Sequence, residues 1–273
     1  MDMTTFLIQN PDLDRAPTDE EMTARMEKAA ALAKEQGIPY ISAVVIAGDI
    51  LSGERSKQWV ERGLDGTEAV GFVGSFARLD FVVWAVEGGH LPDTYLMDNL
   101  PDLWRGSDPD DSDPRFLSLW KRAWLAGEAT IFDSPKGMTL LDNVTDGEWV
   151  KVYRGQVGDR NQPTGIAWST DWKVANKFAK TGGLRGVIDL GGYVLTRWVK
   201  REDILAYLVG RGESEVVVDP RDLITDDTYL SIFLPDERAQ EEEDRWSLER
   251  EHREAMDEER EAVFAEMELG DDR

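Results

Sequence analysis

The stretch EWVKVYRG, residues 148–155, is where the chain changes from helix-like to strand-like patterns. Val150 and Val152 alternate with Lys151 and Tyr153, as in a half-buried strand. Similar short, β-rich segments follow downstream: GIAWST (165–170), GVIDL (186–190), YVLTRWV (193–199), ILAYLV (204–209) and SEVVV (214–218). A helix is expected over residues 171–180. The second half of the chain therefore predicts a β-rich domain.

The chain before residue 148 has helical patterns instead. Thr18 and Glu21 have the spacing of a capping box, which predicts the start of a helix over residues 19–36. Further helices are expected over residues 54–62, 67–88 and 114–127. The last of these segments has a proline in its first turn.

The end of the chain is strongly acidic. Residues 236–273 carry 17 acidic and 6 basic residues and contain no proline, which favours a long, mostly solvated helix. The predicted fold class is therefore α+β. We expect a helical domain over residues 1–147, a β-rich domain over 148–235 and an acidic C-terminal helix or tail over 236–273.

Composition excludes several classes of site. The chain has 273 residues, a formal net charge of −24, no cysteine and two histidines. Thiolate nucleophiles, disulfides and zinc–thiolate sites are therefore excluded, and we expect no metal centre.

No apolar run is long enough to span a membrane, and no secretory signal is evident, so a cytoplasmic protein is expected. The negative charge disfavours direct binding to nucleic acid and favours basic partners.

Three short segments of the β-rich half carry the candidate chemistry, each at an expected strand end. Glu213 and Glu215 are two positions apart, so strand alternation would place both carboxylates on one face. Such carboxylates suit a reaction that passes through a sugar oxocarbenium ion. Arg154 on a neighbouring strand could hold a phosphate, and Ser169 could orient a carboxylate by a hydrogen bond. Together these residues suit cleavage at a nucleotide-linked ribose.

Each residue also has a plain structural explanation. Arg154 could be a surface ion-pair residue. Ser169, alone or with Thr170, could cap the helix over residues 171–180. The glutamate pair could protect the edge of the VVV strand from aggregation.

In order, these segments resemble the R-S-E class of mono-ADP-ribosyltransferases. Tyr153-Arg154-Gly155 is similar to the arginine motif of the family, Trp168-Ser169-Thr170 to its aromatic-Ser-Thr motif, and Glu213-Ser214-Glu215 to its Glu-x-Glu motif. The resemblance covers about residues 148–225 and is to the compact type found in phage and bacterial proteins. It differs at Asp171, where the family has Ser or Thr.

The resemblance implies a split-sheet transferase fold and the use of NAD as substrate. Arg154, with Tyr153, Gly155, Trp168 and Thr170 around it, would bind NAD. Ser169 would orient Glu215, Glu215 would stabilise the oxocarbenium ion, and Glu213 would position or deprotonate the acceptor. The Gly-rich segment 181–186 would lie near nicotinamide. Tyr207 and Arg211 could contact the acceptor, or be core and surface residues.

The expected function is therefore transfer of ADP-ribose from NAD to a protein acceptor. Glu-x-Glu in this family accompanies arginine as acceptor, and a phage-encoded enzyme would act on host proteins. Two alternatives remain open: an NAD glycohydrolase with the same site, and a non-enzymatic acidic binding or structural protein whose transferase-like domain is inactive.

Overall fold

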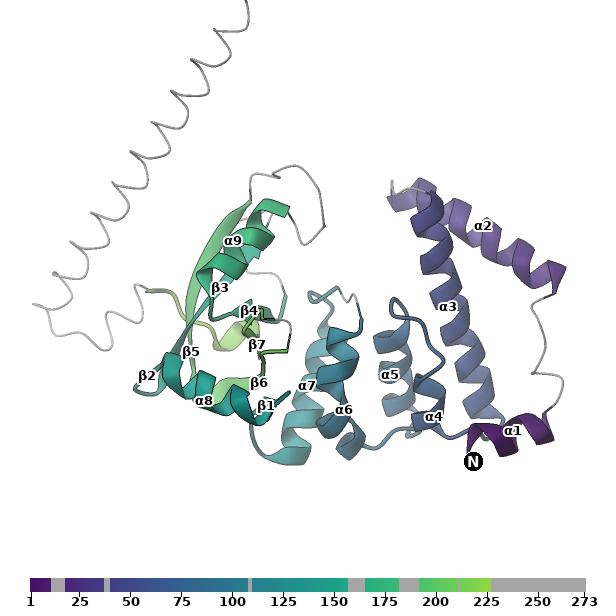
Figure 1. Ribbon diagram of the computed structural model, residues 1–273, viewed down its shortest axis with the longest axis horizontal. Coiled ribbons are helices and arrows are strands. Elements are labelled where there is room, and N and C mark those ends of the chain that lie inside the picture. Colours follow the sequence, from purple (N-terminus) through teal and green to yellow (C-terminus); the bar gives the residue numbers. More distant parts are fainter. Residues whose placement is uncertain are drawn as a thin grey trace, which may run out of the picture. The chain divides into compact units, whose positions relative to one another are not determined.

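The described residues of the first half of the chain form seven helices (Figure 1): α1 (Met3–Gln9), α2 (Asp19–Gln36), α3 (Tyr40–Glu61), α4 (Gly66–Val70), α5 (Arg78–Glu87), α6 (Asp93–Arg105) and α7 (Pro114–Gly127). The computed structural model describes residues 1–10, 18–36, 40–107, 110–156, 165–181, 192–210 and 212–226. Met1–Leu223 form one compact unit. The predicted acidic helix over 236–273 lies outside the described residues.

Two of the predicted helices are confirmed together with their starts. At α2, the Thr18 amide donates to Glu21 Oε2 at 2.7 Å, and the Glu21 amide donates to Thr18 Oγ1 at 3.3 Å. This is the predicted capping box. At α7, the Asp113 side chain accepts from the Arg115 amide at 2.9 Å, and Pro114 occupies the first turn.

The helices expected over residues 54–62 and 67–88 are wrong in extent. The first is the end of the longer α3, and the second is divided into α4 and α5 by a turn over residues 71–77. Asp49 of α3 holds this turn, because its Oδ2 accepts from the Phe76 amide at 3.1 Å. Gly74 lies so close to Asp49 that an added Cβ would sit 2.1 Å from its carboxyl carbon. A tertiary contact therefore overrides the local helical preference.

The second half forms a mixed sheet with two helices. The strands are β1 (Ile131–Phe132), β2 (Thr145–Asp146), β3 (Trp149–Gln156), β4 (Ala167–Ser169), β5 (Tyr193–Lys200), β6 (Ile204–Leu208) and β7 (Glu215–Val218). The helices are α8 (Pro135–Val144) and α9 (Trp172–Thr181), and short 3₁₀ turns cover Arg201–Asp203 and Pro220–Asp222. The α+β class is therefore confirmed at this level.

The strand order is β1-β6-β7-β4-β3-β2, and β5 also pairs with β3. Strands β6 and β7, both predicted from the sequence, pair with each other in antiparallel fashion. Strand β5 is antiparallel to β3 from Trp149–Lys200 to Gln156–Tyr193. The strand expected over residues 186–190 lies outside the described part of the chain.

Two large hydrophobic cores hold most of these elements, and a small third cluster of Ala29, Ala43 and Ala47 lies between α2 and α3. The first core joins the helices to the sheet: Trp104, Phe116 and Trp120 pack in the same cluster as Leu205, Leu208 and Val217. The second lies between the sheet and α8 and includes Leu141, Val152, Trp168, Tyr207 and Val216. The predicted boundary at residues 147/148 thus falls inside the unit Met1–Leu223, and β1 and α8, which precede that boundary, belong to the sheet region.

Candidate functional site

Three of the predicted motifs lie side by side in the sheet. Tyr153 of β3 is directly opposite Ser169 of β4, and Ser169 is directly opposite Glu215 of β7. Directly opposed residues on neighbouring strands have Cβ atoms about 5 Å apart. Residues separated by 16 and 46 positions in the chain are therefore brought into one row across three strands, with Arg154 next to the first of them.

Ser169 is buried and uses its hydroxyl locally. Its Oγ donates to the Glu213 carbonyl at 2.6 Å and accepts from the Asp171 amide at 3.0 Å. A hydroxyl has one proton, so the donor of Ser169 serves the Glu213 backbone. Asp171 is the cap of α9, since its Oδ1 accepts from the Lys173 amide at 2.8 Å. Asp171 thus has a structural role, which Ser or Thr could also fill.

The Glu-x-Glu segment has a bent backbone. Strand β7 begins at Glu215, and Ser214 has a φ of 45°, in the left-handed region. Strand alternation therefore does not apply to Glu213 and Glu215, because it holds only for extended backbone. Thr170 supports this bend: its amide donates to the Ser214 carbonyl at 3.0 Å.

Glu215 is held from the helical half of the chain. The indole Nε1 of Trp104, in α6, donates to Glu215 Oε1 at 2.7 Å. Trp104 is 5% exposed and belongs to the first core. The carboxylate proposed for catalysis is thus bonded to a residue 111 positions earlier in the chain.

Arg154 is paired with Asp111, which precedes α7. Its Nη1 donates to Asp111 Oδ2 at 2.6 Å, and its Nη2 to Asp111 Oδ1 at 3.0 Å. Nη1 also donates to the Ala167 carbonyl, while the Ala167 amide donates to Asp111 Oδ2 at 3.2 Å. Arg154 and Asp111 therefore join β3 to the beginning of β4 and satisfy both backbone groups of Ala167.

Gly155 allows α9 to lie against β3 (Figure 1). A Cβ at this position would be 1.9 Å from the Ala175 carbonyl oxygen and 2.4 Å from the Ala179 amide nitrogen. No side chain can be accommodated there unless the helix moves. The glycine of the Tyr-Arg-Gly motif therefore has a packing role that needs no nucleotide.

The remaining predicted residues are partly or wholly interior. Trp168 is 2% exposed in the second core, and its indole N–H has no hydrogen-bond partner within the described parts of the chain. Tyr207 is 1% exposed, and its hydroxyl lies 3.2 Å from Thr170 Oγ1, so it is a core residue and not an acceptor contact. Tyr153 is half-buried. Arg211 and residues 182–186 of the Gly-rich segment lie outside the described residues.

Sequence reasoning missed Trp104, which bonds to Glu215, and Asp111, which pairs with Arg154. Trp104 reads as an ordinary core residue, and Asp111 as one of several acids in the polar loop SDPDDSDP, residues 107–114. Both lie in the helical half, far from the motifs in the chain. No local pattern marks a partner at that separation.

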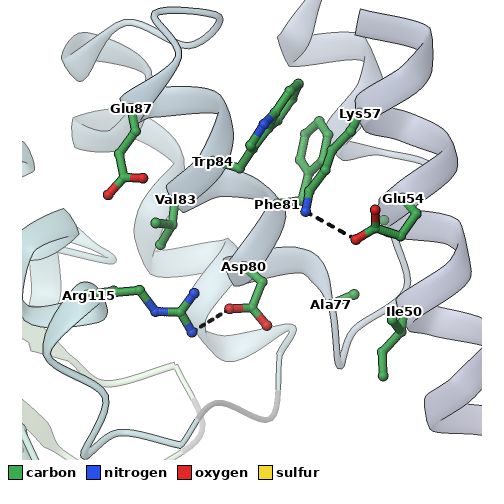
Figure 2. Close-up of a pocket in the computed structure, with 11 residues that line it drawn as sticks. Ile50, Glu54, Lys57, Ala77, Asp80, Phe81, Val83, Trp84, Glu87 and Arg115 are labelled. Atoms are coloured by element: carbon green, nitrogen blue, oxygen red, sulfur yellow. Dashed lines mark hydrogen bonds and ion pairs between the residues drawn. The ribbon is translucent and has the colours of Figure 1, made fainter. Parts of the chain in front are cut away.

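A separate cavity of 460 Å³ lies between α3 and α5, with Arg115 of α7 at one side (Figure 2). Lys57 Nζ is 3.2 Å from Glu54 Oε1, and Arg115 Nη2 is 2.7 Å from Asp80 Oδ1. Both cations in its wall are therefore already neutralised, and we assign no ligand to it.

Within the ranges that the structure describes, no three His, Asp or Glu side chains gather so as to hold a metal ion. None of the described helices has both the length and the apolar character needed to cross a membrane. Comparisons of the chain with protein-family models, curated proteins and solved structures found no match.

Proposed function

We propose that the protein is a mono-ADP-ribosyltransferase, which cleaves NAD between nicotinamide and ribose and transfers ADP-ribose to a protein. One observation carries the proposal: Tyr153, Ser169 and Glu215 lie opposite one another on three adjacent strands. The order of the motifs in the chain did not require this register. It supports a shared site for the arginine, serine and glutamate segments.

The proposed reaction uses the two glutamates differently. The bond from the ribose C1′ to the nicotinamide nitrogen breaks, and its electron pair leaves with nicotinamide. Glu215 stabilises the resulting oxocarbenium ion by its negative charge. A nucleophile of the acceptor then forms a bond to C1′, and Glu213 takes its proton.

Arg154 would hold a phosphate of NAD in this scheme. In the structure its two terminal nitrogens donate bidentate hydrogen bonds to the Asp111 carboxylate. The same planar fork accommodates a phosphate, which presents oxygens at similar spacing. Binding of an NAD phosphate at Arg154 therefore requires the hydrogen bonds between Arg154 and Asp111 to break.

The direct test is release of nicotinamide from NAD by the purified protein and by its Glu215→Gln variant. Glutamine keeps the size of the side chain and an oxygen for Trp104, but removes the charge. We expect the rate to fall about a hundredfold or more. The matched control is Glu148→Gln, which changes an exposed carboxylate outside the site. Equal loss in both variants, or none in Glu215→Gln, contradicts the role of Glu215.

A second measurement separates transfer from hydrolysis. The protein is incubated with labelled NAD and a cell lysate, and the label on proteins is counted. If the protein transfers ADP-ribose, lysate proteins become labelled, and the labelling depends on Glu213 and Glu215. We expect arginine as the acceptor, because Glu-x-Glu accompanies arginine in the family and the chain's charge of −24 attracts basic partners. Free ADP-ribose without labelled protein indicates an NAD glycohydrolase.

The Asp111–Arg154 pair also favours a second candidate, a non-enzymatic binding protein. With its charge neutralised inside the molecule, Arg154 would then serve only to join β3 and β4. This alternative predicts a folded protein that releases no nicotinamide, with or without lysate.

A further inference from the structure

Trp104 is fixed in position by aromatic neighbours. Its ring meets Trp120 edge to face with centroids 5.7 Å apart, and meets Phe116 in the same manner at 6.2 Å. Both neighbours belong to α7, whereas Trp104 belongs to α6. A side chain packed in this way between two helices has little freedom to turn, so the direction of its indole N–H is set by the core.

The hydrogen bond from Trp104 is not repeated by nearby tryptophans. The indole nitrogens of Trp59, Trp120 and Trp124 are buried in the same half and find no hydrogen-bond partner among the described residues. Trp104 Nε1 alone of these four is bonded, at 2.7 Å to Glu215 Oε1. A bond to an ionised acceptor is stronger than one between neutral groups. The core thus directs one rigid donor at one carboxylate oxygen.

Ser169 does not supply this donor. Its single hydroxyl proton is directed to the Glu213 carbonyl at 2.6 Å, although Ser169 lies directly opposite Glu215. The orienting role that the family resemblance gives to the serine is therefore open in this chain.

The geometry assigns the orientation of Glu215 to Trp104, as a positioning residue in the NAD reaction proposed above, on which this inference rests. Trp104 holds one carboxylate oxygen, which limits rotation of the carboxylate and directs its charge toward the ribose. Loss of the donor keeps Glu215 in place but removes the hydrogen bond that fixes this oxygen. Misplacement of a reacting group by about 1 Å can cost about a hundredfold in rate.

The experiment compares Trp104→Phe with Trp120→Phe in nicotinamide release by the full chain. Each variant removes one indole from the same cluster, but only Trp104 loses a hydrogen bond. Thermal unfolding is recorded for both, and the kinetics are measured well below the lower midpoint. We expect Trp104→Phe to lower kcat about tenfold or more with KM for NAD within about twofold, because NAD binding is unchanged. Trp120→Phe should keep kcat within about twofold of the wild type.

Each other outcome overturns a different statement. If the wild type and Glu215→Gln differ as expected but Trp104→Phe behaves like Trp120→Phe, the positioning role is wrong and the proposed function stands. If Trp104→Phe raises KM with unchanged kcat, Trp104 acts in NAD binding and the inference also fails. If the folded wild type releases no nicotinamide, the proposed function fails, and the positioning role with it.

Discussion

Asp111 controls the charge of the proposed nucleotide site. Its carboxylate accepts from both terminal nitrogens of Arg154 and from the Ala167 amide. These three donors form a cradle for an anion, and at present a side chain of the protein occupies it. The side chains of Arg154 and Asp111 are 15% and 21% exposed, so the pair is shielded from most of the screening that weakens surface ion pairs.

The first prediction is that the Asp111→Asn substitution lowers the KM for NAD in the turnover assay. Asparagine keeps the shape of the side chain but not its charge, so Arg154 is freed for phosphate. We expect KM for NAD to fall about tenfold, since a hydrogen bond to a charged group contributes about 1.5–3 kcal/mol. The free energy of unfolding should fall by about 1–3 kcal/mol as the join between β3 and β4 weakens.

Asp110→Asn is the control for this prediction, because Asp110 is the adjacent carboxylate and its side chain accepts from Ser112 within its own turn. It should leave KM unchanged. An unchanged or higher KM in Asp111→Asn would mean that Asp111 does not compete with NAD and that the pair has a structural role.

At the scale of elements, Asp219 ties α7 to the end of β7. Its side chain is 3% exposed and forms ion pairs with Lys121 of α7 and with Arg221, whose Nη2 is 2.5 Å from Asp219 Oδ2. The hydrogen bond from Arg221, followed by that from Lys121, holds the pKa of Asp219 well below its usual range, against the opposing effect of burial. The charged carboxylate is therefore part of the folded state.

The second prediction follows from this lowered pKa. A carboxyl group with a folded pKa below its unfolded value of about 4 stabilises the protein above pH 4 and loses that effect as the pH falls toward the folded pKa. We expect the free energy of unfolding to decrease below about pH 4, with Asp219 contributing about 1–3 kcal/mol at neutral pH.

Denaturant unfolding of the wild type and of Asp219→Asn between pH 2.5 and 7 measures this contribution. The difference between the two proteins should be largest at neutral pH and shrink in acid. A difference that stays constant over this range would show that the charge of Asp219 does not stabilise the fold.

For the whole molecule, the helices and the sheet share the first core. Leu205, Leu208 and Val217 of the sheet are buried in a cluster with Trp104 and Trp120 of the helices. Separating the halves would expose these side chains to water, and burial of each contributes about 1.5–3 kcal/mol. This loss is large compared with the usual 5–15 kcal/mol of total stability.

The third prediction is that residues 128–226, which contain β1 to β7, do not fold without α1–α7. Circular dichroism and denaturant titration of this fragment should show no cooperative transition. The matched control is the fragment 1–226, which keeps the whole unit Met1–Leu223 and should unfold in one transition. Cooperative unfolding of 128–226 would show that the sheet is an independent domain.

Several features could be predicted from the sequence because their causes are local. Helices α2 and α7 are recognisable from capping residues next to them in the chain, and β3, β6 and β7 from alternation and β-branched residues within each segment. The α+β class follows from these patterns. The order of the three motifs can likewise be identified from the amino-acid sequence without a structure.

The arrangement of the site depended on the tertiary structure. Asp49, from the adjacent helix α3, holds the turn that interrupts the helix expected over 67–88. The left-handed backbone of Ser214 means that strand alternation does not apply to the two glutamates. Asp111 meets Arg154 across 43 positions, and Trp104 meets Glu215 across 111. Capping and periodicity act over a few residues, whereas strand register and these side-chain partners arise only when distant segments pack around one core.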